Sequence, residues 1–295
     1  MRGVLTLAGE GTRMLPWTRG LRKEFLPLYD RGHNGAAVLK PVAHIVLETL
    51  IDAGVNDVTL VVGAKDLAFV QNYFTVDREF LDRHAHHAER LTETRRFYAT
   101  LGRLRLRFAV QPSPKGFGDA VLQAEPYVAP EPFFLHAADA LLLEPHRGRL
   151  LRAMGEMMIR DGLDAVLLVR RVADPARYGV VEVAADGKEG RLTRLRVKGM
   201  EEKPKQPKST WAATAAYAFS PRMFAALKAI ARETHPVELE VTDAVRRLIA
   251  DGAGVAALVL TPTSGEWLSV GSPEGFVRAL KRTQRLAHAR SSPAK

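Results

Sequence analysis

The sequence contains no cysteine among its 295 residues. Disulfide bonds, thiolate metal sites and cysteine nucleophiles are therefore excluded. No apolar run approaches the roughly 18 residues that a bilayer-spanning helix requires. An apolar strand pattern already begins at Val4, which leaves no room for a signal peptide. We therefore expect a cytoplasmic protein without a membrane partner.

Acidic residues are the minority among the charges, because 33 Asp and Glu stand against 43 Lys and Arg, for a net charge of +10. A basic surface attracts anions, whether nucleotides, nucleic acids or acidic lipids. The sequence lacks a block of Lys and Arg interleaved with aromatic residues, the pattern that follows a nucleic-acid strand. We interpret most of the charge as solvated surface and expect small anionic substrates with no nucleic-acid partner.

Strand patterns alternate with helix patterns through the first part of the chain, and 46% of the sequence is hydrophobic. This rhythm is typical of a mostly parallel sheet with helices on both faces. We predict an α/β, Rossmann-like fold. The expected strands are Val4–Leu7, Val58–Val62, Leu104–Val110, Phe133–Leu135 and Ala165–Val169, and the expected helices are Val42–Ala53, 66–101, 118–124 and 147–160.

The second part of the chain is richer in strand patterns. A hairpin of Tyr178–Val183 and Leu192–Lys198 is expected around the turn 186–190, followed by a strand over Ala212–Phe219. We predict a single domain over 1–290, with a first part of about 1–170, a β-rich part of about 171–272 and a helix over 273–290. The tail 291–295 is expected to fray, and the segment 30–40, which is rich in Gly, His and Asn, is expected to be a loop. The remaining expected elements are helices over 221–231 and 240–250 and a strand over Val255–Leu260.

The most informative motif directly follows the first expected strand. It reads Leu7-Ala8-Gly9-Glu10-Gly11-Thr12-Arg13-Met14-Leu15-Pro16, with Arg22-Lys23-Glu24-Phe25-Leu26-Pro27 a few residues later. Glycines in such a turn let backbone N–H groups approach an anion closely. Arg13 adds a planar, permanently charged fork suited to phosphate, and Lys23 adds a mobile point charge. The motif is not a P-loop, because no G-x-x-x-x-G-K-[ST] is present.

Two further polar segments follow expected strands. His136-Ala137-Ala138-Asp139 comes after Phe133–Leu135, and Gln111–Gly118 comes after Leu104–Val110. Ligands of parallel sheets bind beyond the carboxyl ends of the strands, so the three segments are expected to converge. Asp139 suits Mg²⁺, which prefers oxygen ligands, although an Asp at this position could instead cap a turn or a helix. His136 is interpreted as a structural, hydrogen-bonding residue.

Together these motifs resemble the sugar-1-phosphate nucleotidyltransferases. Met14-Leu15-Pro16 and Lys23-Glu24-Phe25-Leu26-Pro27 are closer to the bacterial and archaeal UTP–glucose-1-phosphate uridylyltransferases (UDP-glucose pyrophosphorylases) than to the thymidylyltransferases. The resemblance covers nearly the whole chain in order, and relative to the family pattern the loop 30–40 looks like an insertion. It implies the nucleotide-diphospho-sugar transferase fold, with a nucleotide-binding part over 1–170 and a smaller, β-rich sugar-binding part over 171–272.

The resemblance also implies the activity, which is transfer of a uridylyl group from UTP to glucose 1-phosphate, giving UDP-glucose and pyrophosphate with Mg²⁺ as cofactor. The catalytic residues would be Arg13, Lys23 and Asp139, with Asp139 as the metal ligand. The sugar phosphate would be bound by Gly179, Glu202, Lys203 and Thr214. The nucleotide would be bound by Ala8, Gly9, Glu10, Gly11, Thr12, Arg13, Lys23, Gln111 and Gly116.

One position departs from the family pattern. Ser269, in Trp267-Leu268-Ser269-Val270-Gly271, stands where the family usually carries an aspartate that is a second metal ligand. A neutral hydroxyl is a weaker ligand, although Mg²⁺ usually keeps several waters and can bind through few protein groups. A catalytically weakened regulatory homologue that binds nucleotide sugars therefore stays open. The resemblance also gives Gln111 the role of reading the base, to which its amide can offer a donor and an acceptor. Uracil and thymine share the edge that it would read, so a thymidylyltransferase using dTTP stays open as well. The family also implies a homodimer or homotetramer.

Overall fold

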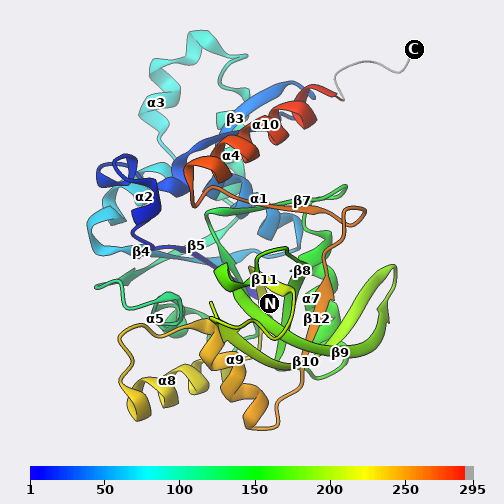
Figure 1. Ribbon diagram of the computed structural model, residues 1–295. Helices are drawn as coiled ribbons and strands as arrows, with labels where there is room; N and C mark the ends of the chain where they lie inside the picture. Colours follow the sequence, from blue (N-terminus) through cyan, green and yellow to red (C-terminus); the bar gives the residue numbers. More distant parts are fainter. Residues whose placement is uncertain (290–295) are drawn as a thin grey trace.

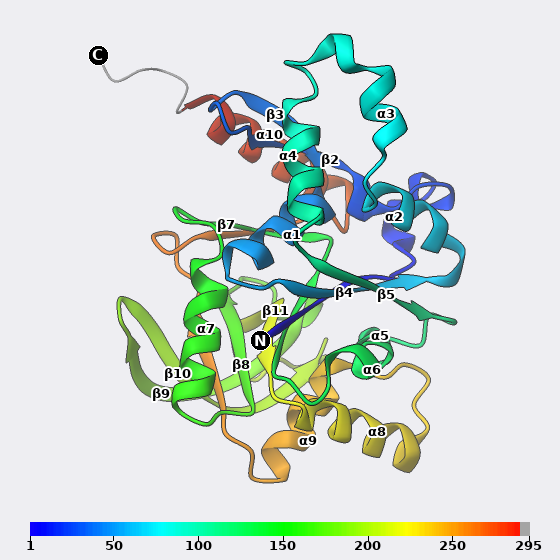
Figure 2. The ribbon, with the colours of Figure 1, turned by 180° about the vertical axis from the view of Figure 1, so that it is seen from behind.

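A nine-stranded sheet forms the centre of the computed structural model, which describes residues 1–289 (Figures 1 and 2). Strands β11 and β10 run opposite to the other strands, so the predicted mostly parallel α/β fold is confirmed. In order across the sheet, the strands are β5 (Arg105–Gln111), β4 (Asp57–Gly63), β1 (Arg2–Leu7), β6 (Phe133–Ala137), β11 (Trp211–Phe219), β8 (Ala165–Arg171), β12 (Val255–Val259), β10 (Leu192–Glu202) and β9 (Gly179–Glu189).

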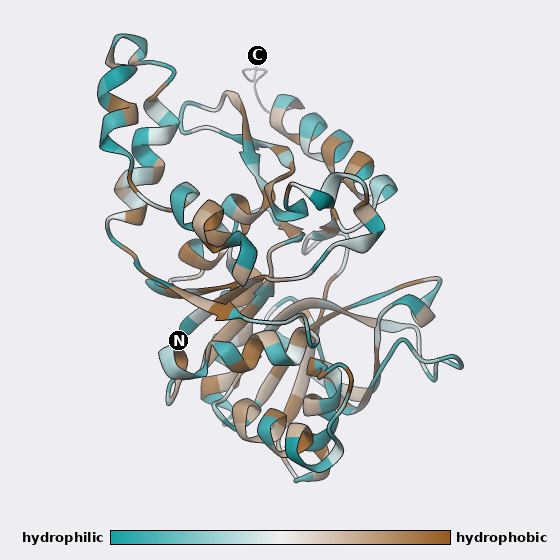
Figure 3. Ribbon diagram, turned by 90° about the vertical axis from the view of Figure 1, so that its left-hand side faces the viewer, coloured by the Kyte–Doolittle hydropathy of each residue, from teal (hydrophilic) through white to brown (hydrophobic). Residues whose placement is uncertain are grey.

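Helices cover both faces of the sheet because successive strand residues point to opposite sides. Leu5 packs into one core and its neighbour Val4 into the other, and both side chains are fully buried. Hydrophobic residues accordingly run along the central strands, with mixed hydrophilic and hydrophobic turns in the helices around them (Figure 3).

One core lies under α1 (Val42–Asp52), α2 (Leu67–Tyr73), α4 (Thr92–Leu101) and α7 (Arg149–Arg160). The other core lies under α5 (Phe117–Gln123), α6 (Glu125–Val128), α8 (Arg222–Thr234) and α9 (Val241–Ala250).

Two small antiparallel sheets lie beside the main one. The hairpin of β2 (Pro27–Arg31) and β3 (Ala37–Pro41) carries α10 (Pro273–Ala289) packed along it (Figure 1). The second pair, β7 (Ala140–Leu143) and β13 (Glu266–Ser269), joins the segment after Asp139 to the segment before α10. This second pair brings Ser269 next to Asp139.

Several expected boundaries differ from the structure. The helical stretch 66–101 is divided into α2, α3 (Arg78–Arg83) and α4, and the apparent insertion 30–40 is mostly the β2–β3 hairpin. Strand β9 continues to Glu189, so its turn lies later than the predicted 186–190. The expected frayed tail 291–295 lies outside the described residues, and α10 is described to Ala289. Within residues 1–289, no helix is both long and apolar enough to span a membrane.

Candidate active site

The three predicted polar segments meet at one edge of the sheet. Strands β5, β4, β1 and β6 are neighbouring and parallel, so the segments that follow β1, β5 and β6 all leave the sheet at its carboxyl edge. The expected convergence of residues 8–13, 111–118 and 136–139 is therefore observed.

The turn after β1 is held from behind by the segment that follows it. The Thr18 hydroxyl donates to the Gly11 carbonyl at 2.9 Å, and the buried Arg22 guanidinium donates to the Leu7 carbonyl at 2.7 Å. Gly11 has a φ of 67°, and a Cβ there would lie 2.9 Å from Thr18 Cγ2. Gly9, Glu10, Thr12 and Arg13 remain exposed, whereas Ala8 is buried. The turn thus presents its outer side to solvent while its inner side is fixed.

Lys23 and Asp139 form the central ion pair of the site. Their Nζ and Oδ2 atoms lie 2.6 Å apart, and the side chains are only 13% and 18% exposed. Burial alone would raise the pKa of Asp139, but the Lys23 ammonium, with Arg13 nearby, holds it below its ordinary value. Burial would lower the pKa of Lys23, and the Asp139 and Glu24 carboxylates raise it. Both groups therefore stay charged at neutral pH.

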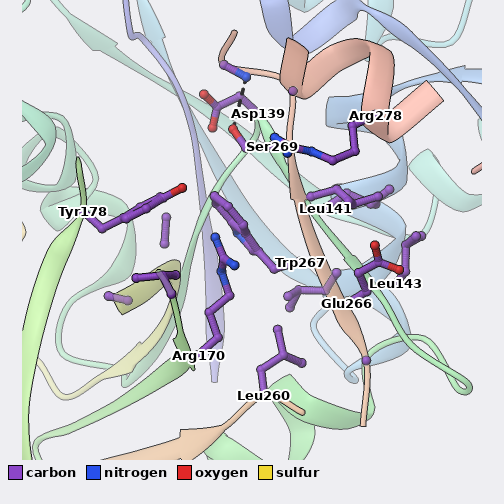
Figure 4. Close-up of a pocket in the computed structure, with 18 of the residues that line it drawn as sticks. Asp139, Leu141, Leu143, Arg170, Tyr178, Leu260, Glu266, Trp267, Ser269 and Arg278 are labelled. Atoms are coloured by element: carbon purple, nitrogen blue, oxygen red, sulfur yellow. Dashed lines mark hydrogen bonds between the residues drawn. The ribbon is translucent and has the colours of Figure 1, made fainter. Parts of the chain in front are cut away.

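Ser269 and Arg13 surround the same carboxylate. The Val270 amide donates to the Asp139 backbone carbonyl at 2.9 Å, and the Ser269 hydroxyl accepts from the Gly271 amide at 3.1 Å. A Cβ placed on Gly271 would lie 3.1 to 3.3 Å from Arg13 Nη2, Ser269 Oγ and Asp139 Oδ2. Three functional groups therefore converge on one glycine, and Figure 4 shows Asp139 and Ser269 side by side.

The side chains of Asp139 and Ser269 supply only part of the oxygen ligands that a metal cation requires. Across residues 1–289, no three His, Asp, Glu or Cys side chains come together in a metal-binding group. Asp139 offers one carboxylate and Ser269 one neutral oxygen. Mg²⁺ commonly binds proteins through one or two carboxylates while substrate phosphates and water complete its shell. The residues present fit that mode of binding.

His136 has the structural role expected of it. Its side chain is fully buried in β6, and Nδ1 lies 2.8 Å from the Ala137 carbonyl. Burial lowers its pKa to about 4, so the ring is neutral at physiological pH.

Gln111 is placed differently from the predicted base-reading role. Its side chain is buried, and Nε2 donates to the Gly116 carbonyl at 3.1 Å and to Asp119 Oδ2 at 2.7 Å. Both amide hydrogens are thus used inside the protein, and only the amide oxygen is left to contact a base. The prediction that Gln111 offers a donor and an acceptor to the base needs this correction.

Gly116 joins the same loop to the segment before α9. The Leu239 amide donates to the Lys115 carbonyl at 2.8 Å, and the Gly118 amide donates to the Leu239 carbonyl at 2.7 Å. Gly116 has a φ of 100°, and a Cβ there would lie 2.5 Å from the Leu239 carbonyl oxygen. This position therefore requires glycine for two independent reasons.

The predicted sugar-side residues Gly179, Glu202 and Lys203 lie together. Lys203 Nζ is 2.8 Å from Glu202 Oε1, and the Lys203 amide donates to the Tyr178 carbonyl at 3.0 Å. A Cβ on Gly179 would lie 3.3 Å from Glu202 Oε2. Burial, together with the Glu202 charge, raises the pKa of nearby Glu240 to about 7. The result is a compact group of polar side chains on β9, β10 and the start of α9.

Thr214 does not present its side chain to this group. It is fully buried, and its hydroxyl donates to the Leu168 carbonyl at 3.0 Å. The register of β11 against β8 shifts between Ala213 and Tyr217, and Ala215 adopts a φ of 56°. Thr214 thus holds an irregularity in β11, and Ala213 and Ala215 face the open space instead.

A cleft of about 1640 Å³ connects the two groups, and Arg13, Asp139, Ser269, Gly179, Glu202 and Lys203 line it. The other predicted nucleotide-binding residues lie outside this lining.

The cleft also includes residues that sequence reasoning did not assign to the site. Arg170 lies against Tyr178 and Trp267, and Arg278 extends from α10 toward Ser269 (Figure 4). In the sequence, Arg170 is distinguished only by its neighbour Arg171, and two adjacent arginines indicate solvated surface charge.

The sequence model of the nucleotidyl transferase family matches residues 2–285. A glucose-1-phosphate thymidylyltransferase of Neisseria gonorrhoeae is 27% identical over 292 residues, covering 97% of this chain and 85% of that protein. A putative UTP–glucose-1-phosphate uridylyltransferase of Methanocaldococcus jannaschii is 31% identical over 260 residues, covering 85% and 82%. The crystal structure of a UDP-glucose pyrophosphorylase complexed with UDP-glucose superposes with a TM-score of 0.80 at 24% identity, covering 97% and 98%.

Glu24 provides a pH-dependent test of the environment of the ion pair. Its carboxylate lies 3.9 Å from both Lys23 Nζ and Arg22 Nε, and burial raises its pKa from 4.5 to about 7. The unfolded chain releases this proton near pH 4.5 but the folded chain keeps it to about pH 7, so the free energy of unfolding falls across that interval. The penalty amounts to about 3 kcal/mol.

Glu24→Gln removes this penalty. The free energy of unfolding of the variant should therefore exceed that of the unmutated protein by more at pH 8 than at pH 5. The two differences should themselves differ by up to about 3 kcal/mol. Urea unfolding of both proteins at the two pH values measures the difference. A difference that does not change with pH contradicts the assignment.

Gly116→Ala should destabilise the protein more than Gly190→Ala. Both glycines have positive φ, but a Cβ on Gly190 would meet nothing within 4 Å. Gly190→Ala should therefore cost only the left-handed backbone penalty of about 1 kcal/mol, whereas Gly116→Ala adds displacement of the Leu239 backbone, about 1–3 kcal/mol more. Urea unfolding of the two variants checks this order, and equal losses would contradict it.

Proposed function

Because this chain belongs to the nucleotidyl transferase family, we propose that it transfers a uridylyl group from UTP to glucose 1-phosphate, forming UDP-glucose and pyrophosphate. The observation that carries the proposal is the cleft lined by Arg13 and Asp139 together with Glu202 and Lys203. Lys23 lies behind this lining and is paired with Asp139. One end supplies cations for a triphosphate, and the other supplies hydroxyl and phosphate partners for a sugar phosphate.

The reaction requires positioning and charge neutralisation. The phosphate oxygen of the sugar phosphate attacks the α-phosphorus in line, and pyrophosphate leaves on the opposite side. Glu202 would accept hydrogen bonds from sugar hydroxyls, and Lys203 would pair with the sugar phosphate, which orients the attacking oxygen. Arg13 would hold the leaving pyrophosphate, and Lys23 would stabilise charge that develops around the α-phosphate. No covalent intermediate on a protein side chain is required.

Asp139 would hold Mg²⁺ together with the substrate phosphates, and Ser269 would contribute at most a neutral oxygen. When bound, the ion supplies neutralisation of phosphate charge. The ion pair with Lys23 keeps Asp139 ionised and oriented before substrates enter.

A thymidylyltransferase using dTTP is the second candidate, favoured by the names of several relatives. Uracil and thymine share the edge that carries their carbonyl and imide groups and differ by a methyl group. With the Gln111 donors already used, this side chain has one acceptor oxygen with which to distinguish bases. A regulatory homologue that binds nucleotide sugars without turnover is the third candidate, motivated by Ser269.

Pyrophosphate release from the purified protein tests the proposal, with Mg²⁺, glucose 1-phosphate and either UTP or dTTP. Release with UTP at higher kcat/KM than with dTTP is the expected result. Asp139→Asn keeps the size of the side chain but removes its charge, and we expect turnover to fall on the order of 10²–10³-fold. Release favouring dTTP selects the second candidate. If folded protein binds UDP-glucose but releases no pyrophosphate with either nucleotide, the regulatory homologue is selected.

Ser269→Asp should lower the Mg²⁺ concentration for half-maximal activity by about 10-fold or more, because it adds a carboxylate beside Asp139. Ser269→Asn is the matched control, since it adds similar volume without charge. A Mg²⁺ titration of pyrophosphate release compares the two variants. An identical Mg²⁺ requirement in both would show that position 269 does not face the metal.

A further inference from the structure

Arg170 lies at the end of β8 with its guanidinium against two aromatic rings that lie on neighbouring sides of it. Its Cζ atom is 4.6 Å from the centre of the Trp267 ring and 5.5 Å from that of Tyr178. The two rings approach each other edge to face, with centroids 6.2 Å apart. All three side chains line the cleft, and Figure 4 shows them grouped together. The stack fixes the position of a side chain that would otherwise sample many rotamers.

The positive charge of Arg170 has no protein counterion. Among residues 1–289, no carboxylate lies within ion-pair distance of it, whereas Arg147 and Arg282, which also line the cleft, are paired with acidic side chains. Arg170 is half-buried, while Arg13 and Arg278 are exposed. A partly desolvated guanidinium without a counterion is costly for the free protein, and a bound anion removes that cost.

Stacking leaves the hydrogen-bonding edge of the guanidinium available. The two rings are inclined at 78° to each other, so the planar group can lie parallel to at most one of them. Its N–H donors lie in the plane of the group and suit the two oxygens of a phosphate or carboxylate. Lysine cannot reproduce this arrangement, because its ammonium is a point charge without a face to stack.

The two aromatic partners place Arg170 between the ends of the cleft. Tyr178 directly precedes Gly179, and its carbonyl accepts the Lys203 amide. Trp267 lies two residues before Ser269 on β13, so both side chains are on the same side of that strand. The guanidinium is therefore fixed against both the sugar-side residues and the strand that borders Asp139.

We propose that Arg170 is an anion-binding residue for the sugar substrate, and that it binds either the phosphate of the sugar 1-phosphate or a carboxylate carried by the sugar. The inference rests on the proposed function for the identity of the substrate. The anion-binding role itself rests on the stack, the missing counterion and the place of Arg170 in the cleft.

The test compares three variants by calorimetric binding of glucose 1-phosphate and of UTP. Arg170→Gln removes the charge, and Arg170→Lys keeps the charge but removes the stacked fork. Arg171→Gln is the matched control, because Arg171 also lines the cleft but is more exposed and lies over Trp211 instead, at 4.8 Å from the ring centre. The thermal midpoint of each variant reports any purely structural contribution of the stack.

Arg170→Gln should weaken glucose 1-phosphate binding about 10- to 100-fold, as expected for a lost charge-assisted hydrogen-bond pair, and leave UTP binding within about 2-fold. Arg170→Lys should recover only part of the loss, and Arg171→Gln should bind as the unmutated protein does. Unchanged affinity with a lowered thermal midpoint would assign the stack a structural role and overturn the proposal. Equal losses in Arg170→Gln and Arg171→Gln would also overturn it, because they would reflect general charge.

Binding of UDP-glucose and UDP-glucuronate identifies the anion. If the anion is the phosphate, Arg170→Gln weakens both ligands equally. If it is a sugar carboxylate, the unmutated protein prefers UDP-glucuronate and Arg170→Gln removes that preference. Turnover in the same preparations separates this inference from the proposed function. If the protein turns over but its affinity for glucose 1-phosphate does not depend on Arg170, the role of Arg170 is refuted and the transferase activity is not. If the protein is inactive but its affinity for glucose 1-phosphate depends on Arg170, the transferase activity is refuted and the role of Arg170 is not.

Discussion

The ion pair between Lys23 and Asp139 is the contact on which the arrangement of the site depends. It joins residues 116 positions apart in the sequence, one shortly before β2 and one just after β6. Breaking one side of a pair that is this well buried would leave an uncompensated charge. Arg13, Ser269 and Gly271 are then arranged around the same carboxylate, so the local chemistry follows from a single long-range contact.

The cleft combines paired and unpaired cations. Lys23 and Lys203 each contact a carboxylate, which positions them, whereas Arg170 carries a charge that the protein leaves unbalanced. Two polyanionic substrates must be brought together in one space, and their repulsion is relieved only if the protein supplies excess positive charge there. The lining of the cleft holds nine Lys and Arg against eight Asp and Glu, so cations without an acidic partner, such as Arg170, have to supply that charge.

The sequence predicted the fold class and the convergence of three polar segments, because apolar strands and their polar ends are local patterns. It did not predict the internal hydrogen bonds of Gln111 or the burial of Thr214, since both depend on partners far along the chain. Strands β7 and β13 are short and became visible only through their pairing. Arg170 was indistinguishable from surface arginine until Trp267 and Tyr178 were placed beside it.

The pairing of β13 with β7 has a consequence for biosynthesis. Asp139 and β7 leave the ribosome more than a hundred residues before β13 and α10, which complete the wall of the cleft. Until Glu266–Ser269 has been translated, β7 is an unpaired edge of hydrophobic residues, open to pairing with other chains. A nascent chain therefore exposes a hydrophobic strand while its substrate-binding space is still unfinished, and a chaperone bound during that interval would contact the same residues that later border the cleft.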